Sequence, residues 1–313
     1  MESLIKSENF LENILEKFLV ETGGKLPAYI PELSKARPES FAISIVTVEG
    51  KILQAGDIKT FFTIQSIAKP LVHGLALETH GREKILNMVG LEPTGDSYNS
   101  IRLQPGSHRP YNPMVNAGAL ALSSLIPGEN PELRFHALQN LFERYIGHVP
   151  NFDEQVYQSE KKFGNHNRAM SYLMLNFKVL QGDVEEILDD YCKECSFLVN
   201  TTNLALIGAA LANGGKNPLT QKQAIDPEYL ADILSVMFTC GMYDFAGEWA
   251  YKVGIPAKSG ISGGILGVVP GKMGIGVYSP LLDSRGNSVR GIKVFQELAE
   301  ILQFNIFKSS NLL

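Results

Sequence analysis

The sequence predicts an α/β protein of the α+β type, in which helices flank an antiparallel sheet and a helical lobe is inserted between its strands. Strand-like hairpins near both ends of the chain and helical patterns in the middle predict this class. No repeat, low-complexity tract or flexible linker divides the 313 residues. We therefore expect a single unit over 1–313, with a sheet lobe from 1–63 and 251–313 and a helical lobe from 64–250. A cleft between the lobes is where a small molecule would bind.

Two hairpins supply the predicted sheet. Near the start, residues 41–48 are rich in β-branched and apolar side chains, Glu49-Gly50 makes a turn, and residues 51–55 return. Near the end, residues 264–269 form an apolar strand, Pro270-Gly271 a turn, and residues 273–278 the return strand. Because hairpin strands are antiparallel, both chain ends are expected to contribute to one antiparallel sheet.

Helical spacing of apolar residues predicts the other elements. An amphipathic surface helix is expected near the N-terminus, from Leu4 to Leu19. Asp183 and Thr202 are typical N-caps, and Asn213-Gly214-Gly215 supplies residues that end a helix. The remaining predicted helices cover residues 70–79, 131–145, 169–180, 184–195, 203–213, 227–239 and 292–302.

The composition favours a compact protein that acts on small molecules. Apolar residues make up 44% and charged residues 19%, which is typical of a globular chain. The net charge of −5 means that the chain lacks the excess of positive charge typical of proteins that bind nucleic acid or an anionic membrane. The N-terminal helix is interrupted by glutamates, unlike a signal peptide, and no run of about 18 apolar residues occurs. We expect a cytoplasmic protein that forms a homodimer or homotetramer.

The cysteines do not suggest a metal or a cofactor. Cys192 and Cys195 form a lone C-x-x-C, and Cys240 is isolated. A structural zinc site needs about four ligands, and no second C-x-x-C or paired histidine motif accompanies this one. Reduced cytosolic thiols are the simpler interpretation, so neither metal nor cofactor is expected.

The segment FFTIQSIAKPL contains the strongest local signal for chemistry. A strand-like run, residues 61–64, leads into a helix that begins near Ser66, where free N–H groups and the helix dipole favour developing negative charge. Lys69 lies one turn later on the same face. Lowering the Lys69 pKa from about 10.4 toward neutrality costs about 4 kcal/mol, and burial or neighbouring cations can supply that shift. Lys69 could then accept the proton of Ser66.

S-x-x-K alone is a weak signal, because it also occurs at Ser3/Lys6 and Ser159/Lys162. Only Ser66/Lys69 stands at a strand-to-helix junction among apolar residues. An N-cap serine followed by a solvated lysine is the alternative explanation of this pair.

A second motif supports a catalytic role. Lys258-Ser259-Gly260 is the only K-[ST]-G in the chain, and it leads into the strand at Gly264. Penicillin-recognising serine enzymes pair S-x-x-K on a helix with K-T-G on an edge strand, in this chain order. There the strand backbone and the nucleophile's own N–H form the oxyanion hole. A tight turn with close packing remains the structural alternative for these glycines.

Longer runs make the resemblance specific. The chain resembles the serine-dependent glutaminase family, whose fold is β-lactamase/transpeptidase-like, from about Lys25 to Phe304. The resemblance is carried by Gln65-Ser66 through Lys69-Pro70, NPMVNAGA from Asn112, Ser159-Glu160 with Gly164 and Asn167, Tyr191 followed by Cys195-Ser196, LANGG from Leu211, CGMYDF from Cys240, and PAKSG from Pro256.

The resemblance implies an activity and a set of site residues. The activity is hydrolysis of the side-chain amide of L-glutamine to L-glutamate and ammonia through an acyl-enzyme on Ser66. The family's catalytic residues fall on Ser66, Lys69 and Tyr191. Its substrate contacts fall on Ser66, Asn116, Glu160, Asn167, Tyr191, Tyr243 and the backbone at Ile261, with Lys258, Ser259 and Gly260 in support.

These residue types suit glutamine. Glu160 offers an anion to the α-ammonium group, whereas Asn116, Asn167 and Tyr243 offer donors to the α-carboxylate. Tyr191 is a natural proton partner, because a tyrosinate beside a cationic lysine is a competent base. Each residue also has an ordinary structural explanation: turn-forming asparagines, a solvated charge run at Glu160, and a tyrosine that packs near Trp249.

Two departures and two rival functions accompany the resemblance. Ile261-Ser262 stands where the family commonly has valine followed by a small residue such as glycine or alanine, and His166 stands where arginine is frequent. The first is a backbone contact and is expected to matter little, whereas the second is expected to alter affinity near Asn167. One rival is a β-lactamase or peptidase on the same fold, and the other is a glutamine-binding protein without catalysis. Asparaginase-type enzymes use a threonine nucleophile in a different arrangement and are not favoured.

Overall fold

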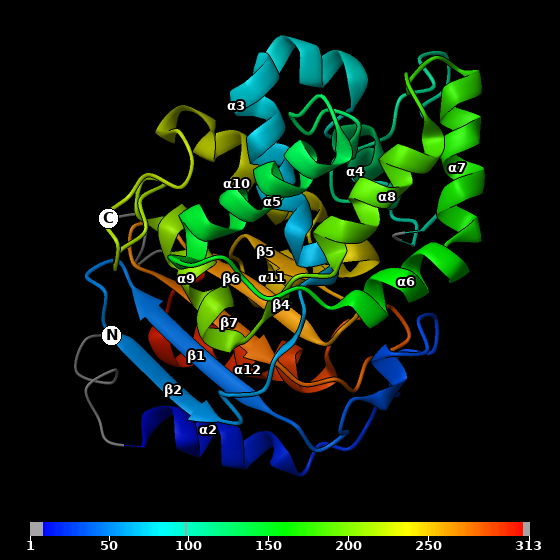
Figure 1. Ribbon diagram of the computed structural model, residues 1–313. Coiled ribbons are helices and arrows are strands. Elements are labelled where there is room, and N and C mark those ends of the chain that lie inside the picture. The colour runs from blue at the N-terminus through cyan, green and yellow to red at the C-terminus, as the bar shows by residue number, and fades with distance from the viewer. Residues whose placement is uncertain (1–8, 98, 309–313) are drawn as a thin grey trace.

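The computed structural model describes residues 9–97 and 99–308, and it confirms the predicted fold class (Figure 1). Five antiparallel strands form the main sheet in the order β2-β1-β7-β6-β5, so strands from both chain ends lie side by side. A separate two-stranded sheet pairs β3 with β4. The strands are β1 (Ala42–Thr47), β2 (Ile52–Gly56), β3 (Phe62–Thr63), β4 (Leu198–Val199), β5 (Ala257–Ser259), β6 (Gly264–Val269) and β7 (Met273–Tyr278).

Helices account for most of the remaining structure. The α-helices are α2 (Phe10–Leu19), α3 (Lys69–Met88), α4 (Asn116–Ser123), α5 (Pro131–Ile146), α6 (Glu154–Phe163), α7 (Asn165–Asn176), α8 (Val184–Cys195), α9 (Thr201–Ala212), α10 (Leu230–Cys240), α11 (Ala246–Lys252) and α12 (Val289–Leu302). Short 3-10 turns are η1 (Leu33–Lys35), η2 (Gln65–Ala68), η3 (Pro227–Tyr229) and η4 (Tyr243–Phe245). In the described ranges, no helix is both long and apolar enough to cross a bilayer.

Helices cover both faces of the sheet. Alternate residues of β1, Ile43 and Ile45, belong to the core cluster that also contains Phe10 of α2 and Phe295 of α12. Val46, with its side chain on the opposite face, packs with residues of α9. Figure 1 shows α2 and α12 on one side of the sheet and the helices from α3 to α10 on the other.

Glycines in β7 allow α9 to pack closely against the sheet. A Cβ atom added at Gly274 would lie 2.1 Å from the carbonyl oxygen of Ala205, and one added at Gly276 would lie 2.2 Å from that of Thr201. Any side chain at either position would therefore push the helix away. Although α9 lies within the predicted 64–250 insert, it forms one cover of the sheet, and the division into two lobes stays a prediction.

The structure confirms both hairpins and the helix at 184–195, whose N-cap Asp183 accepts hydrogen bonds from two backbone N–H groups. Other predicted boundaries were wrong. The helix expected at 169–180 is α7, four residues earlier at each end. Thr202 lies inside α9, because Asn200 is the cap and forms a capping box with Asn203. Leu4 and Ile5 of the predicted N-terminal helix lie outside the described residues.

Candidate active site

The predicted nucleophile lies in a buried turn between β3 and α3. Ser66 is in η2, and Lys69 begins α3 directly after it, so the serine is in the first turn of a continuous helical segment. Their exposed fractions are 7% and 1%. Gln65, just before Ser66, has a left-handed φ of 52°. Such a backbone costs on the order of 1–3 kcal/mol and is concentrated at functional sites.

Lys69 belongs to a chain of buried hydrogen bonds. Its Nζ donates to Asn116 Oδ1 at 2.6 Å, and Asn116 Nδ2 donates to Asn167 Oδ1 at 3.0 Å. These residues occupy the first turns of α3, α4 and α7. The structure therefore brings together three predicted site residues from segments that are far apart in the sequence.

Burial makes Lys69 a competent base. Desolvation lowers the Lys69 pKa to about 8, although Cys195, Glu194 and Glu160 each partly oppose this shift. Near pH 8 a large share of the amine is neutral and can accept a proton. A solvated lysine, the structural alternative considered for this pair, is excluded by its burial.

Two buried carboxyl groups accompany Lys69. Desolvation raises the Glu160 pKa to about 7, and a hydrogen bond from Gln65 and the charge of Lys69 partly oppose the rise. Glu160 is only 4% exposed, so it is not part of a solvated charge run. Desolvation likewise raises the Glu194 pKa to about 8, although the Ser123 hydroxyl donates to its Oε2 atom at 3.1 Å.

Sequence reasoning missed Glu194. It lies three residues after Tyr191 on α8, and residues at that spacing share a helix face. The sequence signal that could have identified Glu194 is its position on the same helix face as Tyr191, a predicted site residue. Its other oxygen, Oε1, is buried and has no hydrogen-bond partner among the described residues.

Tyr191 is buried in the same cluster. Desolvation raises its pKa well above 10, and the charges of Cys195, Glu160 and Glu194 raise it further. The phenol therefore stays protonated at neutral pH. This environment favours Lys69 over an ionised Tyr191 as the group that takes the serine proton.

The K-S-G motif lies on β5, at the edge of the sheet. Lys258 is fully buried, and its Nζ donates to the carbonyl oxygens of Gly241, at 3.1 Å, and Ser259, at 2.7 Å. Desolvation, followed by the charge of Lys69, lowers the Lys258 pKa well below 10.5. Because Gly241 is the C-cap of α10, Lys258 fixes β5 against the end of that helix.

Tyr243 contacts the same strand. Its hydroxyl donates to the carbonyl oxygen of Ser259 at 2.9 Å, and Lys258 Nζ lies 4.2 Å from its ring centroid. A phenol has one proton to donate. A contact from Tyr243 to a substrate carboxylate therefore requires exchange of the bond to Ser259.

The end of the edge strand β5 packs closely against the segment just before Ser66. A Cβ atom added at Gly260 would lie 3.1 Å from the carbonyl oxygen of Ile64. In the described part of the chain, the N–H of Ile261 donates no hydrogen bond. This N–H is therefore not used by another acceptor in the described residues, as an oxyanion donor would require.

A cavity of about 240 Å³ borders the site at Ile261. Its lining also includes Tyr29, Ser97 and Asp244, which come from three other segments. Tyr29 was not singled out from the sequence, because it lies far from every motif in the chain. Glu160 and Asn167 border a second, much smaller space of about 10 Å³, which has room for about one water molecule.

Other sequence signals have structural roles. Asn112 Oδ1 accepts from the backbone N–H groups of Met114 and Val115, at 3.0 and 3.2 Å, just before Asn116 begins α4. His166, one of the two departures, contacts the backbone carbonyl of Asn99 through its ring Nε2. This contact ties the loop before residue 100 to α7, next to Asn167.

Cys192, Cys195 and Cys240 are all buried free thiols. Ser159 of the competing S-x-x-K pair is buried on α6, but Lys162 is exposed. Lys162 is therefore in contact with solvent, unlike the buried Lys69.

The fold and the site together define a class. The antiparallel sheet, the S-x-x-K turn and the K-S-G edge strand combine as in serine hydrolases of the β-lactamase-like fold. The glutaminase family model matches residues 24–307. The chain belongs to the glutaminase family.

Individual relatives agree with this assignment. The glutaminase of Trichormus variabilis is 55% identical over 285 residues, which cover 91% of this chain and 85% of the relative. That of Microcystis aeruginosa is 51% identical over 299 residues, covering 96% and 88%. Among solved structures, Mglu in its glutamate form matches with a TM-score of 0.91 and 37% identity, covering 95% of this chain and 69% of that one. A Bacillus glutaminase matches with a TM-score of 0.86 and 35% identity, covering 95% and 99%.

Proposed function

We propose that this protein hydrolyses the side-chain amide of L-glutamine to L-glutamate and ammonia, with Ser66 as the nucleophile and Lys69 as its base. The observation that carries the proposal is the burial of Lys69 one turn after Ser66, because that burial lowers the Lys69 pKa to about 8. Membership of the glutaminase family supports the choice of substrate.

The reaction proceeds in two stages. Ser66 Oγ attacks the amide carbon while its proton passes to Lys69, and the C–N bond then breaks as the proton is delivered to the departing nitrogen, releasing ammonia. Water next attacks the resulting ester and gives a proton to the same lysine. The bond between the carbonyl carbon and Ser66 Oγ then breaks, Ser66 takes the proton back from Lys69, and glutamate is released. The N–H groups of Ser66 and Ile261 stabilise the oxyanion in both stages.

The remaining site residues bind the substrate. Glu160 pairs with the α-ammonium group of glutamine. Burial raises the Glu160 pKa to about 7 in the empty site, and the bound ammonium cation lowers it again because it stabilises the carboxylate. Asn116, Asn167 and Tyr243 contact the α-carboxylate. Tyr191, protonated in the resting site, relays the proton that Lys69 takes from Ser66: it protonates the leaving nitrogen and is reprotonated by Lys69. Lys258, Ser259 and Gly260 position the edge strand.

Ammonia release tests this function. Purified protein at micromolar concentration is incubated with millimolar L-glutamine, L-asparagine, D-glutamine and a β-lactam, and each product is measured. Release from L-glutamine supports the proposal. Lactam hydrolysis without glutamine hydrolysis would favour the penicillin-recognising alternative, and glutamine binding without turnover would favour the binding protein.

The assembly and the location are also part of the proposal. We expect a single catalytic unit over 1–313 in a cytoplasmic homodimer or homotetramer. The buried residues of α2, among them Phe10 and Ile14, pack within the chain against β2 and α12, so these side chains are not free to form the contact between copies. Light scattering that gives a monomer mass at tens of micromolar protein would contradict the oligomer.

A further inference from the structure

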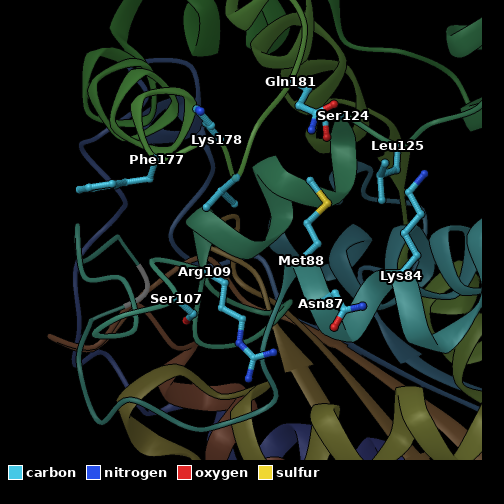
Figure 2. Close-up of a pocket in the computed structure, with 11 residues that line it drawn as sticks. Lys84, Asn87, Met88, Ser107, Arg109, Ser124, Leu125, Phe177, Lys178 and Gln181 are labelled. Carbon is cyan, nitrogen blue, oxygen red and sulfur yellow. The ribbon is translucent and has the colours of Figure 1, made fainter.

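Two of the cavities differ in what surrounds them. One of about 470 Å³ lies between the ends of α3 and α4 and the segment after α7, and none of the predicted site residues lines it (Figure 2). Another, of about 240 Å³, is lined by Ile261, whose N–H is the proposed oxyanion donor, and by residues 25–29. Residues 25–33, which we call the strap, therefore run beside the proposed oxyanion hole.

Ile261 lies in a tight turn between β5 and β6. The Gly263 N–H closes this turn by donating to the Gly260 carbonyl oxygen at 3.0 Å. Such a β-turn uses the carbonyl of its first residue and the N–H of its fourth, so the N–H of the second residue, here Ile261, takes no part in it. The hydrogen bond of the turn therefore does not fix the direction in which the Ile261 N–H points.

The residues around Ile261 give this turn little stiffness of their own. Glycine lacks a Cβ atom and allows a wide range of backbone angles, and both ends of the turn are glycines, Gly260 and Gly263. Ser262, the other central residue, has a buried Oγ atom without a hydrogen-bond partner among the described residues. The orientation of the peptide between Gly260 and Ile261 therefore depends on how the Ile261 side chain is packed.

The Ile261 side chain belongs to a small apolar cluster that is separate from the two large apolar clusters of the core. Its members are Ile30, Leu33, Val156, Ile261 and Leu282. Ile30, from the strap, is 0% exposed, whereas the other four are 4–8% exposed. In so small a cluster, truncation of its most completely buried member leaves a void that the others fill only in part.

Both ends of the strap are fixed by backbone hydrogen bonds. Lys25 and Leu282 exchange two of them, each 2.9 Å long, and at the other end the Leu33 N–H donates to the Ile30 carbonyl oxygen at 3.0 Å. Truncation of the Ile30 side chain removes none of these donors or acceptors. The expected response is therefore a void in the cluster of Ile261 while the strap stays in place.

We propose that Ile30 is a positioning residue for the oxyanion hole. By packing in the cluster of Ile261, it aims the Ile261 N–H at the substrate oxygen that becomes negatively charged when Ser66 attacks. The inference rests on the proposed hydrolysis of glutamine, because the oxyanion forms in that reaction. Loss of a complete oxyanion donor lowers kcat about 100- to 1,000-fold, so a donor that is present but poorly aimed should lower kcat about tenfold.

Steady-state kinetics of ammonia release from L-glutamine test this role. In Ile30→Ala, kcat should fall about tenfold while KM stays within about twofold, because the lost interaction strengthens only in the transition state. Ile30→Val removes a single carbon atom and should lower kcat about threefold or less. Leu11→Ala is the matched control, because Leu11 is 2% exposed and lies on α2 in a different apolar cluster. It should lose stability and keep the native kcat.

A double-mutant cycle shows whether Ile30 acts through Ile261. Ile261→Ala keeps the backbone N–H and removes the side chain that Ile30 supports, so it should also lower kcat about tenfold. If the two side chains act as one unit, Ile30→Ala/Ile261→Ala should be no more than about twofold worse than either single variant. Independent effects would instead multiply to about 100-fold.

Binding of a boronic acid analogue of glutamine, in which boron replaces the side-chain amide carbon, gives a second measurement. Its adduct with Ser66 is tetrahedral and resembles the transition state, whereas the same carbon of L-glutamate is planar. Ile30→Ala should therefore weaken binding of the boronic acid about tenfold and binding of L-glutamate less than about twofold.

A native kcat in Ile30→Ala, a change confined to KM, losses that multiply in the double variant, or equal weakening of the boronic acid and L-glutamate would each overturn the inference. Native protein that releases no ammonia would contradict the proposed function, and this inference with it. Melting temperatures above the assay temperature show that the variants are folded. If Ile30→Ala melts below that temperature, Ile30→Val takes its place in all three measurements, with the smaller loss expected.

Discussion

Raising the pH from 6 to 8 should increase the rate of glutamine hydrolysis, because attack by Ser66 requires a neutral Lys69. Burial lowers the Lys69 pKa to about 8. The neutral fraction of this amine is then about 1% at pH 6 and about 50% at pH 8. The rate at saturating substrate should therefore rise about 50-fold across this interval and level off above about pH 9.

The plateau distinguishes Lys69 from Tyr191 as the base. The Tyr191 pKa lies well above 10, so a tyrosinate mechanism would give a rate that continues to rise about tenfold per pH unit through pH 9. Tyr191→Phe removes that possibility. If Lys69 is the base, this variant loses rate but keeps a midpoint near pH 8.

The assay is the initial rate of ammonia release at saturating L-glutamine between pH 5.5 and 10. Lys162→Ala is the matched control, because Lys162 occupies the same place in the S-x-x-K pair on α6 but is exposed to solvent. It should keep the native profile. A flat profile, a rate that falls with rising pH, or a Tyr191→Phe profile with no midpoint would refute the assignment of Lys69.

Further substitutions test the other parts of the site and the fold. Ser66→Ala should lose nearly all turnover, and an electrophilic glutamine analogue should label Ser66 in the native enzyme, as peptide mass spectrometry can show. Glu160→Gln should raise KM more than it lowers kcat, and should lower kcat/KM by about 30-fold or more if the pair with the ammonium group is desolvated; native rates on N-acylated glutamine would contradict that role. Glu194→Gln removes a negative charge that raises the Lys69 pKa, so the midpoint of the pH profile should move to lower pH, and an unmoved midpoint would count against this coupling. Gly241→Ala would place a Cβ atom 1.8 Å from a carbonyl oxygen of β5. The free energy of unfolding should therefore fall by about 3 kcal/mol or more, which urea denaturation would show as a lower midpoint.

The strands were predictable because their signals are local. Residues 264–269 and 273–278 are apolar runs on either side of a Pro-Gly turn, and the structure has β6 and β7 within those bounds. The position of α7 was not predictable in this way. Val179 and Leu180 extend an apolar pattern beyond the helix, but the left-handed backbone at Lys178 ends it. The neighbouring Phe177 stacks on His108 of the 107–109 loop, a long-range contact that the sequence does not reveal.

Helix α4 was missed for a different reason. It is buried on every side, so Asn116 to Ser123 has no amphipathic period to detect. Burial also determines which ionisable groups have altered acidity. Motif spacing predicted Ser66 and Lys69, whereas Glu194 carries no motif and becomes notable only when α8 packs it beside α4.

The buried ionisable groups explain why a zwitterion suits this site. Lys69 and Lys258 contribute two potential positive charges, and Glu160 and Glu194 two potential negative charges, in a region without solvent to screen them. Their pKa values move toward neutrality because charging any one of them alone is costly. A free amino acid brings both an ammonium and a carboxylate, so its entry adds no net charge to the cluster. A substrate with a blocked amino group would bring an unbalanced carboxylate next to Glu160. Desolvation already keeps part of Glu160 protonated in the empty site, and an unpaired carboxylate nearby would add Coulomb repulsion to the cost of ionising it. We therefore expect selectivity for free glutamine to follow from burial of charge as well as from shape.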